Sequence, residues 1–314
     1  MEFNNVAILL TENCNARCEM CCDSRGRVVG KTLDINEIDL ILENINNVKS
    51  INHISLTGGE PMLYKEMVEY ILNYKFNRNR NINISLKTNG FWGNNFSKAE
   101  EFISKYAKKI SKISLSYDEF HIPFINVDSL KNIIKISTKN NIPTEVVACF
   151  LNDSMKPGEI LDMLGEESYY TDYYFQPVIK TGSAKDFNCN KYIKLLDTDR
   201  DILACIATSD PDLTINPNLD VFPCCSQVIE NTILKIGNLK EETLENIIQS
   251  VLHNEIFCTL FSEGFTPFLN LLIKNNIEYP KELASPCEFC EFLFKSDWFL
   301  EILKNEKFYS SLKK

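Results

Sequence analysis

Three cysteines close to the start of the chain could hold an iron–sulfur cluster. Cys14, Cys18 and Cys21 are separated by three and then two residues, and they directly follow an apolar run at residues 6–10. An iron–sulfur cluster normally takes four cysteine thiolates. Three thiolates therefore leave one iron of a four-iron cluster open to a substrate or cofactor. The same spacing could instead serve a zinc site or a loop of buried thiols.

A second set of cysteines lies in the last third of the chain. It comprises Cys205, the adjacent pair Cys224 and Cys225, and Cys287 and Cys290, which are two residues apart. We predict that Cys205, Cys224, Cys287 and Cys290 ligate a second, closed cluster. A tetrahedral zinc site is the alternative, because zinc sites also use such pairs.

The side chains of the adjacent cysteines Cys224 and Cys225 should point in opposite directions. Neighbouring side chains on an extended strand point to opposite faces. If Cys224 faces a cluster, Cys225 faces away from it and could donate a hydrogen atom to a substrate. The alternative is an inert buried thiol.

A glycine pair marks a further candidate site. Gly58-Gly59-Glu60-Pro61 follows a strand that the sequence predicts at residues 53–57. Adjacent glycines let the backbone approach a ligand closely, and a carboxylate suits an ammonium partner. The alternative is an ordinary turn.

The elements that must position these residues alternate between strands and helices. The sequence predicts strands at residues 6–10, 53–57, 82–88, 112–116, 145–150 and 173–179. It predicts helices at residues 34–45, 64–74, 98–108 and 128–139. The first of these helices has a capping box formed by Asp34 and Glu37. Alternating strands and helices imply parallel pairing, so we predict an α/β fold with a partial (β/α)6 barrel of the TIM type.

The candidate motifs follow successive strands. The cysteine loop follows the first strand and the glycine pair the second, while Asn89 and Ser116 stand at the ends of the third and fourth. Barrel enzymes place their sites at this carboxyl-terminal face, so we expect the motifs to meet there.

The pattern of alternating strands and helices changes after residue 180. We predict a hairpin at residues 212–223, helices at 241–261 and 267–275, and a helical tail at 297–312. The expected organisation is a barrel domain at residues 1–182 and a small cluster domain at residues 183–314.

Composition limits the class of protein. The 314 residues are 44% hydrophobic and carry a net charge of −10, which disfavours a nucleic-acid partner. No signal peptide or membrane-spanning run is evident. We therefore expect a soluble, cytoplasmic protein with no membrane partner, in which the twelve cysteines serve metal or catalytic chemistry.

The segment Cys14-Asn15-Ala16-Arg17-Cys18-Glu19-Met20-Cys21 resembles the signature of radical S-adenosylmethionine (SAM) enzymes. The resemblance implies a [4Fe–4S] cluster whose open iron binds SAM, and cleavage of SAM to a 5′-deoxyadenosyl radical. It also implies that Met20, Gly58, Gly59, Glu60, Asn89 and Ser116 bind SAM. In the family, the glycine–glutamate element contacts the SAM amino group. The second cysteine set resembles a SPASM or "twitch" domain, which carries a second [4Fe–4S] cluster.

A closer resemblance concerns four further segments. Thr88–Gly93, Ser116–His121, Phe222–Ser226 and Glu263–Phe265 are similar to the radical SAM peptide epimerases that make epipeptides, the YydG or EpeE type. This implies conversion of L- to D-residues in a ribosomally made precursor peptide. It also implies a catalytic hydrogen-atom donor, Cys225, a catalytic acidic residue, Asp212, and an electron donor such as a flavodoxin or ferredoxin. Asp210 is an alternative to Asp212.

Two other functions remain open. A related enzyme could form thioether or carbon–carbon links in its peptide, and a non-catalytic metal-binding scaffold would not cleave SAM. Only thirteen residues precede Cys14, so we expect the peptide to bind directly in the barrel mouth, pairing with an exposed strand. His121 could line the site, whereas Cys22 should point away from it.

Overall fold

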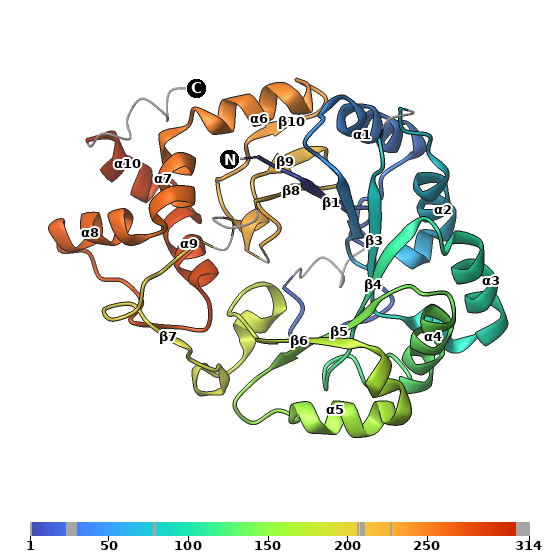
Figure 1. Cartoon of the computed structure of the whole chain (residues 1–314). Helices are drawn as coiled ribbons and strands as arrows, with labels where there is room; N and C mark the ends of the chain where they lie inside the picture. The colour runs from blue at the N-terminus through green and yellow to red at the C-terminus, as the bar shows by residue number, and fades with distance from the viewer. Residues whose placement is uncertain are drawn as a thin grey trace.

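In the computed structural model, a single curved sheet holds most of the chain together (Figure 1). The structure describes residues 2–22, 30–77, 80–205, 207, 211–226 and 228–305. The strands of the sheet are β1 (Asn5–Leu9), β2 (His53–Thr57), β3 (Asn83–Thr88), β4 (Ile110–Ser116), β5 (Thr144–Phe150), β6 (Asp172–Pro177), β8 (Asp212–Ile215), β9 (Asp220–Phe222) and β10 (Gly237–Asn238). A short pair, β7 (Leu196–Asp197) and β11 (Glu282–Leu283), lies apart from it.

The sheet has the order β10-β9-β8-β1-β2-β3-β4-β5-β6. Strands β1 to β6 are parallel, as predicted for a partial barrel. The helices that follow them cover the outer face in Figure 1: α1 (Ile35–Asn47), α2 (Lys65–Asn73), α3 (Phe96–Tyr106), α4 (Val127–Lys139) and α5 (Pro157–Leu164). Helix α5 was not predicted.

Helix α1 begins as the sequence indicates. The main-chain NH of Glu37 donates to Asp34 Oδ1 (2.8 Å), and the NH of Asp34 donates to Glu37 Oε2 (3.1 Å). This capping box satisfies main-chain donors of the first turn. The buried face of the helix carries Ile38, Ile41, Leu42 and Ile45, while Ile35, at 40% exposure, lies outside it.

The predicted hairpin extends the barrel sheet across the expected domain boundary. Strands β8 and β9 pair antiparallel, and β8 also pairs parallel with β1, from Asn5 opposite Asp212 to Ile8 opposite Ile215. The hairpin is therefore part of the sheet that carries the cysteine loop. The division at residue 182 itself stays a prediction.

The helices of the last third are α6 (Leu244–Leu252), α7 (Glu255–Glu263), α8 (Thr266–Lys274), α9 (Pro286–Phe294) and α10 (Trp298–Lys304). The prediction of one helix over residues 241–261 is wrong. Asn254 interrupts it, because its side chain accepts from the NH groups of Ile256 (3.0 Å) and Phe257 (3.4 Å) and so caps α7. The predicted tail forms α10 as far as residue 304, and residues 306–312 of it lie outside the described residues.

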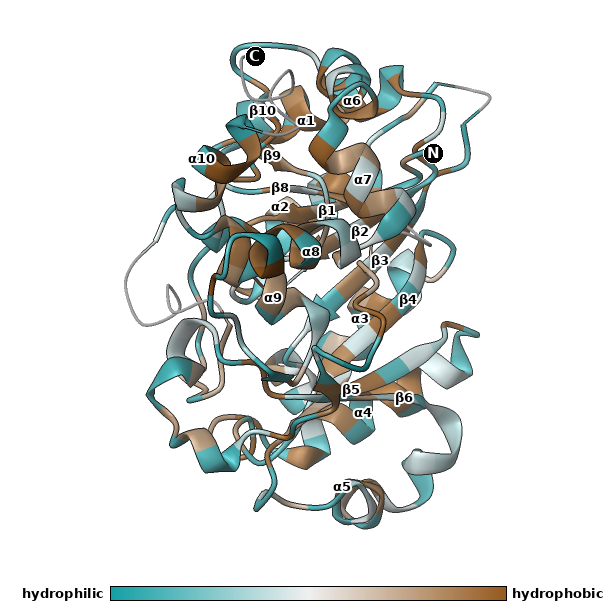
Figure 2. Ribbon diagram, turned by 90° about the vertical axis from the view of Figure 1, so that its left-hand side faces the viewer, coloured by the Kyte–Doolittle hydropathy of each residue, from teal (hydrophilic) through white to brown (hydrophobic). Residues whose placement is uncertain are grey.

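One large hydrophobic core joins the barrel strands to these later helices. Figure 2 shows hydrophobic residues along α6, α7 and α8, beside the strands of the sheet. Among the described residues, no single helix has the length and apolar character to span a membrane. Helices α7 and α8 meet that test only together, as a pair bent by 109°, and by length and composition alone.

Candidate functional site

A cavity of about 400 Å³ opens at the carboxyl ends of the barrel strands. Its size is in the range of small-molecule sites. Residues from the loop after β1, from β3 and β4, and from the hairpin β8–β9 line it together. As predicted, the cavity therefore collects the motifs that follow successive strands.

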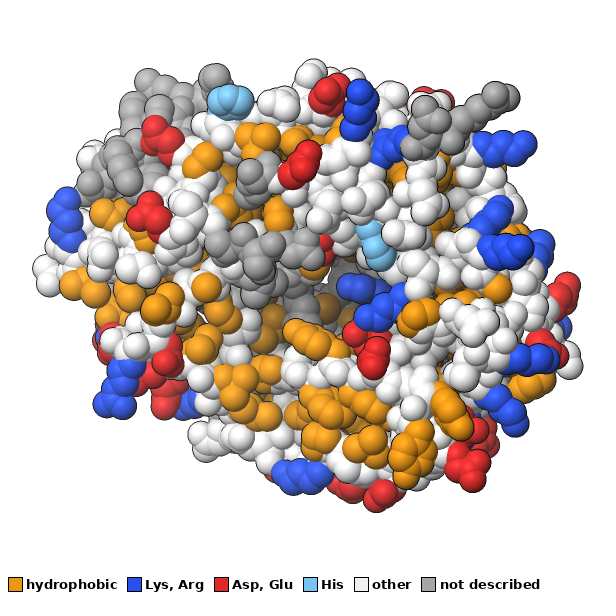
Figure 3. Space-filling view, in the orientation of Figure 1, with side chains coloured by type: hydrophobic (Ala, Val, Ile, Leu, Met, Phe, Trp, Pro, Cys, Tyr) orange, Lys and Arg blue, Asp and Glu red, His pale blue; other side chains and the backbone are white. Residues whose placement is uncertain are grey.

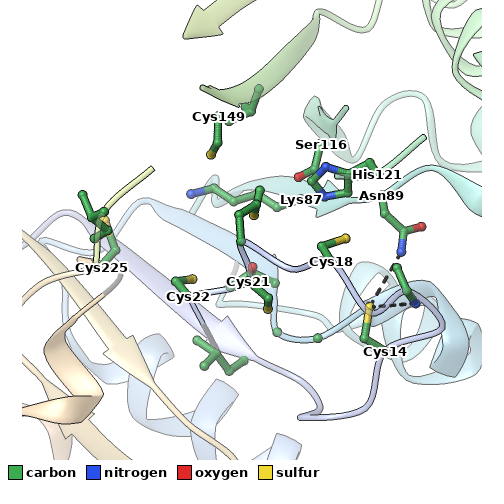
Figure 4. Close-up of a pocket in the computed structure, with 18 of the residues that line it drawn as sticks. Cys14, Cys18, Cys21, Cys22, Lys87, Asn89, Ser116, His121, Cys149 and Cys225 are labelled. Atoms are coloured by element: carbon green, nitrogen blue, oxygen red, sulfur yellow. Dashed lines mark hydrogen bonds between the residues drawn. The ribbon is translucent and has the colours of Figure 1, made fainter. Parts of the chain in front are cut away.

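The first cysteine set lies on one side of this cavity. Cys14, Cys18 and Cys21 all line it, and Figure 4 shows them on one loop. Cys14 Sγ accepts from the main-chain NH of Ala16 (3.4 Å), and burial raises the pKa of its thiol to about 11. The carbonyl of Cys21 accepts from the NH of Ser183 (2.9 Å), which fixes the end of the loop.

The three thiols of this loop match the number that a cluster with one open iron atom needs. Within the described ranges, no group of three or more His, Cys, Asp or Glu residues could hold one metal ion. In a four-iron cluster, by contrast, each thiolate binds a different iron atom. The cysteine loop therefore fits the predicted cluster, with no fourth cysteine assigned to it.

Only glycine fits at positions 58 and 59, because the backbone there lies against the cysteine loop. A Cβ at Gly58, whose φ is 134°, would lie 2.5 Å from the carbonyl oxygen of Thr11, and one at Gly59 would lie 2.2 Å from that of Asn13. The NH of Gly59 donates to the Thr11 carbonyl (2.7 Å). Both glycines line the cavity, so their backbone forms part of its wall.

Glu60, in contrast, is not among the residues that line the cavity. Its carboxylate is fully buried and accepts from the NH groups of Met62 (2.9 Å) and Asn89 (2.7 Å) and from Thr88 Oγ1 (2.7 Å). Burial raises its pKa to about 7. In this conformation the side chain holds the end of β3. Its predicted contact with the SAM amino group has no geometric support here.

The remaining predicted SAM-binding residues all line the cavity. Asn89 Nδ2 donates to Asn15 Oδ1 (2.9 Å) and lies 3.8 Å from Cys14 Sγ. Ser116 ends β4, and Met20 belongs to the cysteine loop. Their assignment to SAM stays a prediction.

His121 and Cys22 also line the cavity. The position of His121 agrees with the expectation, whereas that of Cys22 does not. Asp118, which is fully buried, binds His121 Nδ1 (2.7 Å) and accepts from the NH of Cys149 (2.9 Å). Although burial lowers the pKa of His121, Asp118 raises it to about 10.

Cys225 lines the cavity on the side away from the cysteine loop (Figure 4). Its thiol donates to Asp212 Oδ2 (3.2 Å), at the first residue of β8. Asp210, the alternative, lies outside the described residues. Cys225 is accessible because it borders the cavity, yet protein atoms surround it. This burial, with the nearby charge of Asp212, raises its pKa to about 12, while Lys87 lowers it. The thiol therefore keeps its hydrogen at neutral pH.

The structure brings the cysteines of the second set near one another. Cys287 and Cys290 lie one turn apart on α9. The charge of Cys290 acts on Cys224, and that of Cys287 acts on Cys205, Cys224 and Cys290. Burial first, and then these neighbours, raise the pKa of Cys224 and Cys290 well above the ordinary value. Cys224 thus faces the cysteines while Cys225 faces the cavity.

This second set fits a cluster for the same reason as the first. The four thiols lie near one another, one buried and three partly buried. A closed cluster uses four such thiolates.

Lys87, which the sequence reasoning missed, also lines the cavity. On β3 it is an exposed residue between two buried ones, Leu86 and Thr88. The available signal was its position two residues before Asn89, which puts both side chains on one face of the strand.

The comparisons with known proteins agree with this arrangement. Residues 8–163 match the radical SAM superfamily, and residues 205–291 match SPASM, an iron–sulfur cluster-binding domain. The chain is 30% identical over 310 residues to the "putative peptide biosynthesis protein YydG" of Bacillus subtilis, covering 94% of this chain and 93% of that protein.

The chain belongs to the radical SAM superfamily.

Solved structures of similar fold include anSMEcpe with bound AdoMet, with a TM-score of 0.62 and 14% identity over 99% of this chain and 98% of that one. SuiB of Streptococcus suis, bound to its precursor peptide SuiA, has a TM-score of 0.60 and 14% identity over 92% and 76%. These likenesses confirm the fold class, a partial barrel with a C-terminal SPASM domain.

The cofactors follow from the family and from the cysteines. The prediction of SAM with two [4Fe–4S] clusters, one of them auxiliary, is confirmed. Which cysteine binds which cluster stays a prediction. The two groups of cysteines described above agree with it.

Proposed function

We propose that this radical SAM enzyme converts L- to D-residues in a ribosomally made peptide, with Cys225 as the hydrogen-atom donor. One observation carries the proposal. A thiol held by Asp212 lies in the same cavity as the first cysteine set and on its other side. Because YydG is named as a peptide biosynthesis protein, a peptide is the substrate class we assign.

The arrangement gives the two faces of a substrate carbon different chemistry. The cluster and SAM, when bound, supply the radical that removes one hydrogen atom from the α-carbon. Cys225 then returns a hydrogen atom from the opposite face. Its S–H bond breaks, a new C–H bond forms, and the configuration is inverted. An electron, from a donor such as a flavodoxin or ferredoxin, and a proton restore the thiol.

Other residues of the chain prepare this step. Asp212 accepts the S–H hydrogen bond and so directs the Cys225 thiol. Gly58 and Gly59 bring the wall of the cavity close to the cysteine loop. A substrate carbon held inside the cavity is also shielded from hydrogen donors other than Cys225.

Strand β6 offers a place for an extended peptide. It ends the sheet, so one edge has no partner strand among the described residues. Tyr174 is 55% and Phe175 39% exposed, and Figure 3 shows hydrophobic side chains gathered over this region. Gln176 and Val178, just beyond, line the cavity. A peptide added to this edge would therefore lie beside the cavity, and we propose this as the place where the precursor binds.

The experiment compares wild-type enzyme with Cys225→Ala and with a control, Cys258→Ala, which changes an exposed cysteine on α7. Anaerobic, cluster-loaded enzyme receives SAM, reductant and a candidate peptide in deuterated water. Wild type and control should form D-residues and gain about one dalton per inverted residue, because the thiol exchanges with solvent. Cys225→Ala should still form 5′-deoxyadenosine but no D-residue.

Other outcomes would contradict the proposal in different ways. D-residues formed by Cys225→Ala would exclude this donor. A product lighter by two hydrogen atoms would indicate thioether or carbon–carbon bond formation instead. Absence of SAM cleavage by the loaded wild-type protein would favour a non-catalytic scaffold.

A further inference from the structure

Lys87 places a positive charge inside the cavity. It lies on β3, two residues before Asn89, and its side chain is exposed because it borders this space. Figure 4 shows the side chain extending between the cysteine loop and Cys225. Its charge is close enough to Cys225 to lower the pKa of that thiol.

Lys87 has no hydrogen-bond acceptor or ion-pair partner within the described part of the chain. On the next strand, by contrast, Lys112 Nζ binds Glu145 Oε2 at 2.7 Å. A lysine ammonium has three hydrogens to donate and no acceptor group. An ammonium in a cavity without a protein acceptor is therefore available to an oxygen atom of a bound molecule.

The position of Lys87 indicates which oxygen this is. The substrate α-carbon must lie between the radical source and Cys225, and Lys87 extends along that gap. The group found beside every α-carbon, whatever the side chain, is a main-chain carbonyl. We propose that Lys87 donates a hydrogen bond to the peptide carbonyl of the residue that is inverted. This inference rests on the proposed function.

The contact has two consequences. A hydrogen bond to the carbonyl fixes the peptide plane, so that one face of the α-carbon is turned to Cys225. Once the α-hydrogen has been removed, the unpaired electron is shared with that carbonyl, and the nearby positive charge stabilises the electron density on its oxygen. Lys87 is thus a substrate-binding residue whose loss affects both affinity and the return of hydrogen.

The test uses cluster-loaded enzyme with SAM and compares Lys87→Met, Lys87→Arg and a control, Lys98→Met. Lys98 is exposed on α3 and is not one of the residues that line the cavity. Fluorescence anisotropy of a labelled peptide gives the affinity, and product analysis gives the ratio of D-residues to 5′-deoxyadenosine. Lys87→Met should weaken peptide binding about tenfold, as expected for a charge-assisted hydrogen bond, and lower the ratio. Lys87→Arg should retain most of the peptide affinity and most of the product ratio, and the control should match wild type in both.

A second peptide, with an ester in place of the amide at the target residue, identifies the acceptor, because an ester carbonyl accepts hydrogen bonds more weakly. The ester should weaken binding to wild type but not weaken binding to Lys87→Met further. An equal loss in both enzymes would overturn the inference. So would a loss caused only by removing an acidic side chain of the peptide, or a change in SAM affinity with unchanged peptide affinity.

Two further measurements keep the outcome clear. SAM cleavage without peptide checks that Lys87→Met is intact; if it is not, Lys87→Gln decides by the same criteria. Failure of the proposed function is distinguishable, since wild-type enzyme would then make no D-residue, whereas failure of this inference leaves D-residue formation intact.

Discussion

Replacing Glu60 by glutamine removes a buried titrating group while keeping its shape. The carboxylate is fully buried, and its pKa is raised by that burial from 4.5 to about 7. At low pH the folded and unfolded forms are both protonated. As the pH rises from 4.5 to 7 the unfolded form ionises first, so the folded protein loses stability. Glutamine resembles the protonated acid and does not titrate.

The size of the effect follows from the shift in pKa. Each unit corresponds to about 1.4 kcal/mol, so full ionisation costs about 3 kcal/mol. About two thirds of this loss of folding free energy occurs between about pH 5.5 and about pH 8.5, a range in which an iron–sulfur protein can be handled. For 314 residues, an unfolding entropy of about 2 cal/mol/K per residue converts this to about 3 °C in Tm.

The assay is thermal unfolding of loaded wild-type, Glu60→Gln and Glu101→Gln proteins under argon across this pH range. The Tm of Glu60→Gln should rise relative to wild type by about 3 °C from the acidic to the alkaline end. Glu101, an exposed residue of α3, should give no such trend. Parallel curves for wild type and Glu60→Gln would refute the reasoning, since Glu60 would then titrate alike in both states.

Three further changes test the site. Asp212→Ala removes the acceptor of the Cys225 thiol and should slow D-residue formation about fivefold, with 5′-deoxyadenosine formation unchanged. Asn89→Ala removes the amide beside Cys14 and should weaken SAM binding, measured as a smaller change in the electron paramagnetic resonance spectrum of the reduced cluster on adding SAM. Cys290→Ser should lower the iron content from about eight to about four atoms per chain while the spectrum of the SAM-binding cluster persists.

Much of the barrel could be predicted because its signals are local. Strand β2 was predicted with its observed bounds, and the Asp34 capping box fixed the start of α1. The break between α6 and α7 was missed because apolar periodicity continues past Asn254, and periodicity does not register a side chain that caps the next helix. The pairing of β8 with β1 joins residues some two hundred positions apart, which no local pattern encodes.

The candidate site shows the same contrast. Spacing alone identified both cysteine sets, because metal ligands need particular residue types. The direction in which the Glu60 side chain points could not be predicted, since its partners Thr88 and Asn89 lie at and just after the end of β3, some thirty residues along the chain. Lys87 was missed because one lysine in a strand reads as a solvent-facing position.

The hairpin β8–β9 also has a bearing on how such enzymes can diversify. Thr214 Oγ1 donates to the Cys224 carbonyl (2.9 Å), and β8 is paired with β1, so the place of the two neighbouring sulfurs is set by main-chain register. If one amino acid inserted after Asn218 shifted the register of β9 by one residue, the two side chains would exchange faces. Cys224, the proposed ligand, would then point toward the substrate, and Cys225, the proposed donor, toward the cluster. A change in the length of this turn is therefore one way in which a related enzyme could stop inverting residues and form a different product, with the rest of its site unchanged.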